Sequence, residues 1–186
     1  MENVIREVYG VLKSGGSILY PTDTIWGVGC DATNAEAIDK IYKIKERDVN
    51  KPMLVILDDD RKLMRYVKDV PEVAWDILDH NEDPLTIIYP QAMGLATNLP
   101  AANGSIGIRI VKHPFCQALI RKYNKPLVST SANFSGEPSP KNYDEISEEL
   151  KNQVDYIVPQ EYTSGNQKAS GIIKLGVGGQ VQIIRK

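Results

Sequence analysis

The stretch Ile172-Ile173-Lys174-Leu175-Gly176-Val177-Gly178-Gly179-Gln180-Val181-Gln182-Ile183-Ile184 decides the fold class. Its two apolar segments, 172–175 and 181–184, are typical of strands, and the glycines between them are typical of a turn. A parallel pair needs a crossover connection of about a dozen residues or more, which this turn is too short to provide. The two strands are therefore expected to run antiparallel, in a sheet that is not purely parallel.

Upstream of this hairpin, helix and strand patterns alternate along the chain. The apolar periodicity predicts helices at residues 4–12, 33–44, 61–68, 72–78, 115–122 and 143–150. It predicts further strands at residues 17–20, 53–57, 86–89, 105–110, 127–131 and 156–158. Thr33 and Glu36 form a capping-box pattern at the start of the second helix. We expect an α+β (α/β-like) fold, a mixed β-sheet covered by helices, in a single domain over residues 1–186.

Composition and charge exclude several classes of protein. The 22 Lys and Arg residues against 24 Asp and Glu argue against a generally basic nucleic-acid coat protein, although not against a local basic patch. Two cysteines and two histidines make a His/Cys metal site unexpected. The charged start lacks the apolar core of a signal peptide, and the longest apolar run, 53–57, is far too short to span a membrane. We expect a soluble, reduced, cytoplasmic protein.

The common nucleotide and hydrolase motifs are missing, but the segment Pro21-Thr22-Asp23-Thr24-Ile25-Trp26-Gly27-Val28-Gly29-Cys30 carries polar groups where a strand ends. Its two later glycines would let another group approach the backbone closely. The same pattern is equally typical of an Asp/Thr turn followed by tightly packed glycines.

The segment Lys45-Glu46-Arg47-Asp48-Val49-Asn50-Lys51-Pro52 carries three cations near the expected end of a helix. Side chains two residues apart on a helix point about 200° from each other, so Lys45 and Arg47 cannot share a target there. The approaching Pro52 indicates that the helix ends here, and Lys45, Arg47 and Lys51 could then converge on one polyanion. A solvated basic helix end is the alternative.

The segment Ser105-Ile106-Gly107-Ile108-Arg109-Ile110 alternates between apolar and polar positions. Its isoleucines occupy one face of a strand, which leaves Ser105, Gly107 and Arg109 on the other. A ligand could lie across that second face, with the guanidinium of Arg109 holding a carboxylate or a phosphate. An ordinary solvent-facing strand surface would show the same alternation.

The segment Ser129-Thr130-Ser131-Ala132-Asn133-Phe134-Ser135-Gly136 places polar side chains at the end of an apolar strand. The two-residue period puts Ser129, Ser131 and Asn133 on one side. Hydroxyl and amide groups in this position suit the oxygens of a sugar or a phosphate. Local capping of the turn by these side chains is the alternative.

Taken in order, the motifs Pro-Thr-Asp-Thr, Gly-Val-Gly-Cys, Lys-x-Arg, Gly-Ile-Arg-Ile and Ser-Thr-Ser-Ala-Asn-x-Ser-Gly closely resemble the YrdC-like family of threonylcarbamoyl-AMP synthases. The resemblance runs from about residue 8 to residue 185, and it is to the short, single-domain form. It implies a twisted mixed sheet with a concave basic cleft. It also implies that L-threonine, bicarbonate and ATP give threonylcarbamoyl-adenylate and pyrophosphate, with Mg²⁺ accompanying ATP and no tightly bound prosthetic group. The intermediate would pass to a separate tRNA threonylcarbamoyl transferase, and some members are described as binding double-stranded RNA.

The resemblance also implies residue roles. Lys45 and Arg47 match the Lys-x-Arg motif and are the catalytic candidates. Threonine-side positions are Thr24, Arg109, Ser129 and Ser170. Nucleotide-side positions are Arg47, Lys51, Ser105, Ser131, Asn133, Ser139 and Arg185. The family's frequent histidine is Ile56 here, Gly171 replaces the threonine of a late Ser-Thr pair, and no glycine follows Arg185, so the shape of the amino-acid pocket is expected to differ.

Two rival interpretations remain open. One is an RNA-binding or regulatory module that keeps the cleft without catalysis, supported by the basic run Arg61, Lys62, Arg65 and Lys68. Such a run is also typical of a solvated helix face. The other is a paralogue that acts on a different small substrate, supported by the changes at Ile56 and Gly171.

Overall fold

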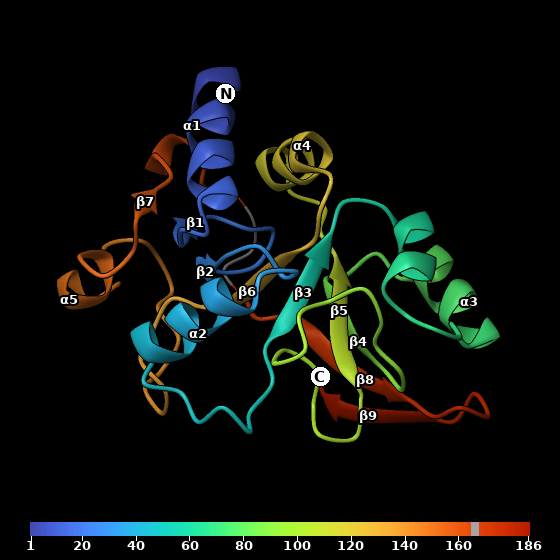
Figure 1. Ribbon diagram of the computed structural model, residues 1–186. Helices are drawn as coiled ribbons and strands as arrows, with labels where there is room; N and C mark the ends of the chain where they lie inside the picture. The colour runs from blue at the N-terminus through green and yellow to red at the C-terminus, as the bar shows by residue number, and fades with distance from the viewer. Residues whose placement is uncertain (165–167) are drawn as a thin grey trace.

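The computed structural model describes residues 1–164 and 168–186 of the chain (Figure 1). The helices are α1 (Glu2–Lys13), α2 (Ala35–Ile44), α3 (Glu72–His80), α4 (Pro114–Tyr123) and α5 (Glu148–Lys151), with 3₁₀ turns η1 (Asp60–Arg65) and η2 (Gln160–Tyr162). The strands are β1 (Ile18–Tyr20), β2 (Gly27–Gly29), β3 (Leu54–Leu57), β4 (Leu85–Tyr89), β5 (Ile106–Ile110), β6 (Leu127–Ser131), β7 (Tyr156–Ile157), β8 (Gly171–Leu175) and β9 (Val181–Arg185).

The strands form one mixed sheet in the order β7-β1-β2-β6-β3-β5-β4-β8-β9. Three neighbouring pairs, β1 with β7, β3 with β5 and β4 with β8, run parallel. The remaining neighbours run antiparallel, including β8 with β9. The expected antiparallel closing hairpin and the mixed, helix-covered α+β sheet are both confirmed.

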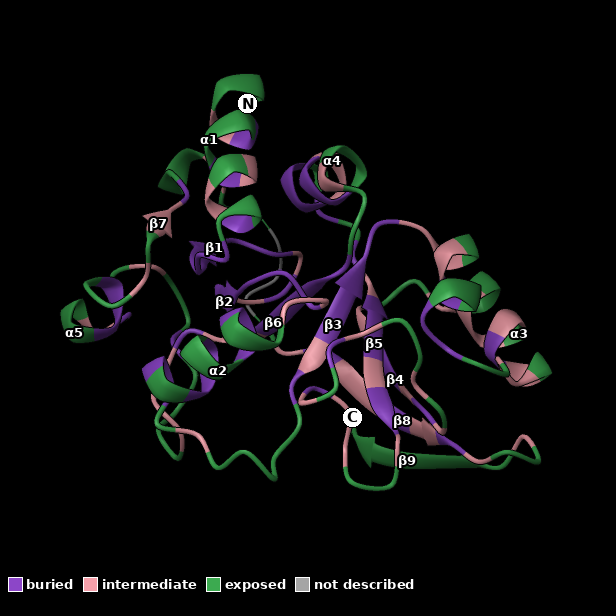
Figure 2. Ribbon diagram, viewed as in Figure 1, coloured by how far each residue is buried: buried purple, intermediate pink, exposed green. Residues whose placement is uncertain are grey.

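Helices cover both faces of the sheet. On one face, Val8 and Leu12 of α1 share a buried cluster with Phe115 and Leu119 of α4 and with Ile56 of β3. On the other face, Ile38 and Ile41 of α2 and Ala74 of α3 share a second buried cluster with strand side chains such as Val55 of β3 and Ile108 of β5. Figure 2 shows the buried strands between the partly exposed helices, whereas β9 at the sheet edge is exposed along its length.

The predicted helix over residues 143–150 is wrong, because only α5 (Glu148–Lys151) is helical. The Ser147 hydroxyl accepts a bond from the backbone N–H of Leu150 and starts this short helix. Upstream, the Asn142 side chain accepts from the Glu145 backbone N–H, at 3.1 Å. These side chains thus accept hydrogen bonds from backbone N–H groups that would bond to backbone carbonyls in a helix. Such local bonds favour turns over a continuous helix.

Three further expectations need correction. The helix cap is Asn34, which accepts from the Ala37 backbone, and not Thr33, whose hydroxyl and N–H both donate to Asp31. The helix expected over 61–68 is the shorter 3₁₀ turn η1. Strand β2 was not predicted, because glycine at both ends of a three-residue strand weakens the propensity signal.

Candidate active site

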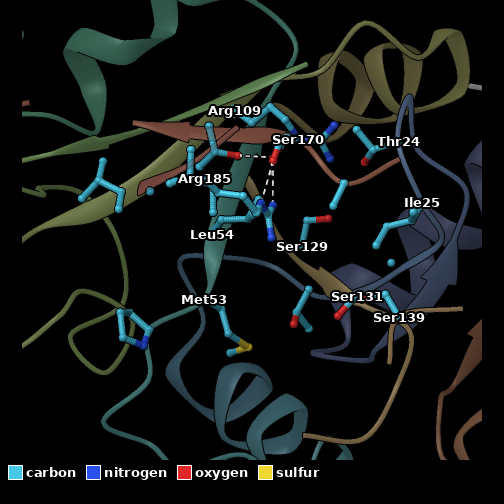
Figure 3. A pocket seen from close by; sticks show the side chains of 18 of the residues that line it. Thr24, Ile25, Met53, Leu54, Arg109, Ser129, Ser131, Ser139, Ser170 and Arg185 are labelled. Carbon is cyan, nitrogen blue, oxygen red and sulfur yellow. Dashed lines mark hydrogen bonds between the residues drawn. The ribbon is translucent and has the colours of Figure 1, made fainter. Parts of the chain in front are cut away.

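A cavity of about 310 Å³ opens across the centre of the sheet (Figure 3). Leu54 of β3 lines it, whereas Ile56, two residues further on the same side of the strand, is buried under α4. The cavity is therefore on the same face of the sheet as α1 and α4, in the part of that face that these two helices leave uncovered. Of the predicted site residues it brings together Thr24, Arg47, Ser105, Arg109, Ser129, Ser131, Ser139, Ser170 and Arg185.

Strand β5 shows the predicted alternation. Ile106 and Ile108 are buried in the core, and Ser105, Gly107 and Arg109 line the cavity. A side chain at position 107 would narrow the cavity floor, since a Cβ there would stand 3.3 Å from a methyl group of Thr86. The alternative, a simple solvent-facing surface, is excluded because Ser105 and Arg109 are buried.

Arg109 is the buried cation of this cavity. Its guanidinium forms an ion pair with Asp23, and only 4% of the Arg109 side chain is exposed. The second Asp23 oxygen accepts from the backbone N–H of Lys112 at 3.0 Å. The Nε atom of Arg109 is buried without a hydrogen-bond partner among the described residues. A guanidinium held in this way has hydrogen-bonding capacity left for a ligand.

The turn between β1 and β2 positions Thr24 at the same cavity. The hydroxyl groups of Thr22 and Thr24 lie 2.9 Å apart, and the Thr24 backbone N–H donates to the Thr22 hydroxyl at 3.1 Å. The Thr22 hydroxyl also donates to the Ile25 carbonyl at 2.8 Å. These local bonds fix the direction in which the turn presents Thr24.

Thr86 of β4, Ser170 just before β8 and Arg185 of β9 form a small polar cluster. Figure 3 shows Ser170 beside Arg185. The hydroxyls of Thr86 and Ser170 lie 2.9 Å apart. Arg185 donates from two nitrogens to the Ser170 carbonyl, at 3.0 and 2.7 Å. Thr86 was not predicted as a site residue, although a buried threonine within an apolar strand was a usable signal. Gly171 and Ile56 do not line the cavity.

Helix α2 ends so that Arg47 reaches the cavity. Glu46 adopts a left-handed conformation with φ of 48°. The N–H of Arg47 bonds to the Tyr42 carbonyl and that of Glu46 to the Lys43 carbonyl, which is the Schellman pattern of a helix end. The Arg47 guanidinium donates to the carbonyls of Lys51 and Pro52, at 2.9 and 3.0 Å.

The expected convergence of Lys45, Arg47 and Lys51 on the cavity is wrong, since Arg47 alone of the three lines it. The left-handed residue between Lys45 and Arg47 turns the chain, and the Lys45 ammonium donates instead to the backbone carbonyls of Ser131 and Asn133. The Lys51 side chain is exposed, and the Lys51 backbone carbonyl accepts a hydrogen bond from Arg47. Asn133 does not line the cavity either, because its amide donates to the carbonyls of Phe134 and Glu137 at 2.8 and 2.9 Å.

Lys45 gives a pH-dependent prediction. Burial, and to a smaller extent the Arg47 charge, lowers the pKa of the Lys45 ammonium from its ordinary 10.5 to about 8. Between these two values the unfolded chain binds more protons at this site, so this group's contribution to stability rises with pH. We expect the wild-type free energy of unfolding, relative to Lys45→Met, to rise by about 2 kcal/mol from about pH 7.5 to about pH 9.5. Urea denaturation of both proteins measures it.

The exposed Lys43 on the same helix provides the matched control. Lys43→Met removes the same charge at an exposed position of the same helix and is measured over the same pH range. A pH-independent difference for Lys45→Met would contradict the buried ammonium.

Other expectations concern the surface and metals. In the basic run, Arg61 forms an ion pair with Asp59 and Lys62 forms one with Asp58, so part of the positive charge of the run is neutralised.

Over residues 1–164 and 168–186, no group of three or more His, Cys, Asp and Glu side chains is placed to hold a metal ion. None of the helices in this described part combines the length and apolarity needed to cross a membrane.

Among curated proteins, the chain is similar to several named threonylcarbamoyl-AMP synthase. It is 33% identical over 183 residues to a threonylcarbamoyl-AMP synthase of Pseudoalteromonas translucida, covering 97% of each chain. It is also 33% identical over 176 residues to the threonylcarbamoyl-AMP synthase of Idiomarina loihiensis, covering 93% of this chain and 94% of that one.

Solved structures share the fold. Escherichia coli YciO matches with a TM-score of 0.84 at 24% identity, covering 100% of this chain and 90% of that one. P. abyssi Sua5 in complex with L-threonine matches with a TM-score of 0.82 at 24% identity, covering 92% of this chain. The match spans 50% of that Sua5 chain, so this chain corresponds to about half of it. The sequence profile named for Sua5, YciO and YrdC, described as "Telomere recombination", matches residues 10–186, and the chain therefore belongs to the Sua5/YciO/YrdC family.

Proposed function

We propose that this chain is a threonylcarbamoyl-AMP synthase that converts L-threonine, bicarbonate and ATP to threonylcarbamoyl-adenylate and pyrophosphate. The observation that carries the proposal is one cavity lined by three arginines, Arg47, Arg109 and Arg185, together with serine and threonine side chains. Near full-length similarity to synthases of this name supports the same function over a non-catalytic module.

The threonine is proposed to bind at the Arg109 end of the cavity. Arg109 would hold the carboxylate, because a buried guanidinium binds a carboxylate strongly and directionally. Thr24, Ser129 and Ser170 supply hydroxyl groups around this end. Figure 3 places Arg109, Ser170 and Thr24 toward one end of the cavity and Met53, Ser131 and Ser139 toward the other.

The nucleotide is proposed to bind toward the second end. Arg47 is held there by the Pro52 carbonyl, next to Met53 in the chain, and would neutralise phosphate charge. Ser105, Ser131 and Ser139 line the same cavity and would contact ribose or phosphate oxygens. Arg185 donates to the Ser170 carbonyl nearer the threonine end, so it would contact only a part of the nucleotide that extends toward that end. Mg²⁺ is proposed to enter with ATP as part of that substrate. Lys45 would act indirectly, by holding the backbone at Ser131.

The proposed chemistry asks for alignment rather than for a nucleophilic side chain. The ammonium of bound threonine first loses a proton, and the neutral amine then adds to CO₂ formed from bicarbonate and loses a second proton to become a carbamate. A carbamate oxygen then attacks the α-phosphorus of ATP, a new P–O bond forms, and pyrophosphate leaves. Such a transfer needs no covalent enzyme intermediate, and it depends on orientation and charge neutralisation. The product would pass to a tRNA threonylcarbamoyl transferase, and direct RNA binding stays a prediction.

Pyrophosphate release, measured with each substrate omitted in turn, tests the proposal. A synthase should release pyrophosphate when threonine, bicarbonate and ATP are all present and fall to background when threonine or bicarbonate is left out. Release that needs neither would contradict the proposal. Release with another acceptor in place of threonine would favour the paralogue.

Arg47→Ala tests the phosphate contact. Losing one charge-assisted contact should cost about 1.5–3 kcal/mol, which corresponds to about one to two decades in the rate of pyrophosphate release at limiting ATP. Arg61→Ala is the matched control, because the Arg61 side chain is 84% exposed and pairs with Asp59 outside the cavity. Wild-type turnover of Arg47→Ala at limiting ATP would show that the phosphate assignment is wrong.

A further inference from the structure

Asp23 links the turn before β2 to the end of β5. One carboxylate oxygen pairs with the Arg109 guanidinium, and the other accepts from the Lys112 backbone N–H at 3.0 Å. Asp23 and Thr24 are neighbours in the chain, and Thr24 lines the cavity. The same turn therefore contributes a hydroxyl to the cavity and an anion to its buried cation.

The ion pair determines how much charge a ligand meets. The side chains of Arg109 and Asp23 are 4% and 11% exposed, so little water screens either group. Together they carry no net charge. A free carboxylate that joins them leaves one excess negative charge in a poorly solvated place, and such a charge is costly. An amino acid in its zwitterionic form brings its own positive charge and avoids that cost.

The ion pair also restricts the direction of the guanidinium. The Nη1 atom of Arg109 donates to Asp23, while the buried Nε has no hydrogen-bond partner among the described residues. An N–H that is buried without an acceptor favours a ligand that supplies one. Asp23 thereby selects which edge of the guanidinium stays open.

We propose that Asp23 is a positioning and specificity residue: it orients Arg109 and offsets its charge, so that the site takes a zwitterionic amino acid in preference to a free carboxylate of the same shape. This inference rests on the proposed function, in which Arg109 holds the threonine carboxylate. Asp23 touches Arg109 rather than the reacting atoms, and its effect is on binding and selection.

Isothermal titration calorimetry with two ligands tests this role. L-Threonine is compared with (R)-3-hydroxybutyrate, which has the same carboxylate, hydroxyl and methyl groups but no amine. In the wild type, threonine should bind more tightly. In Asp23→Asn, the Kd for threonine should rise at least about ten-fold while the Kd for the anion does not rise, so the preference falls by about the same factor.

Two further variants make the test specific. Asp144→Asn makes the same change at an exposed position outside the cavity and should keep both affinities. Asp23→Glu keeps the negative charge on a longer side chain. It should weaken the binding of both ligands yet keep the preference for threonine. If Asp23→Asn does not fold, as judged by its melting curve, the preference measured in Asp23→Glu decides the question.

The outcomes separate the inference from the function it rests on. An equal rise of both Kd values in Asp23→Asn would mean a structural role only and would overturn the inference, as would no change in either. Loss of the preference in Asp23→Glu would also overturn it, and so would a wild type that binds both ligands equally. Failure of the wild type to bind threonine at all would contradict the proposed function itself.

Discussion

Replacing Gly29 with alanine is expected to destabilise the protein by at least about 3 kcal/mol, because the new methyl group overlaps the neighbouring strand. A Cβ at Gly29 would lie 2.0 Å from the Val128 carbonyl oxygen and 3.0 Å from a ring carbon of Tyr20. That oxygen belongs to the backbone of β6 and accepts the Tyr20 hydroxyl at 3.2 Å. Neither atom is the free end of a flexible side chain, so the two strands would have to move apart.

Gly10 is the matched control for this substitution. It lies within α1, and a Cβ there would have nothing within 4 Å. Gly10→Ala should therefore stabilise the protein by roughly 0.5–1 kcal/mol, the usual gain of alanine over glycine in a helix. Urea denaturation measures both variants. A Gly29→Ala protein within about 1 kcal/mol of wild type would contradict the close packing of β2 on β6.

Arg109→Ala is expected to abolish measurable threonine binding and to lower the free energy of unfolding by about 3–5 kcal/mol. The first effect follows from loss of the proposed carboxylate contact. The second follows because Asp23, with an 11% exposed side chain, loses its ion pair with Arg109 and keeps only the hydrogen bond from the Lys112 backbone N–H. Calorimetry with threonine and urea denaturation measure the two effects separately.

The double variant Arg109→Ala with Asp23→Asn separates binding from stability. It removes both charges and should recover part of the lost stability, but no threonine binding. Arg121→Ala serves as the surface control, since its side chain is 74% exposed, and it should stay within about 0.5 kcal/mol of wild type. Threonine binding at wild-type affinity in Arg109→Ala would exclude this residue as the carboxylate ligand.

Period-two alternation made the central strands predictable. In β5 the isoleucines and the polar residues had to separate onto opposite faces, so the pattern placed Arg109 opposite the isoleucines, and the structure shows that this face lines the cavity. The closing hairpin was predictable for a similar reason, because its turn is too short for any parallel connection. Both inferences depend on local geometry over a few residues.

Contacts between distant segments were not predictable from local pattern. Asp23 meets Arg109 across 86 positions, and nothing in either segment by itself indicates the partner. The position of Lys45 depends on the left-handed backbone at Glu46, a conformation that a glutamate rarely adopts. The sequence indicated that the helix ends before Pro52 and that Lys45 and Arg47 could then converge, whereas Lys45 is buried against backbone carbonyls instead.

The most direct test of the account is a crystal structure of the chain with L-threonine and a non-hydrolysable ATP analogue. We expect both ligands in the one cavity, with the threonine carboxylate on Arg109 and the phosphates within reach of Arg47. Threonine bound away from Arg109, or the nucleotide bound outside this cavity, would contradict the claim that a single site aligns the two reactants.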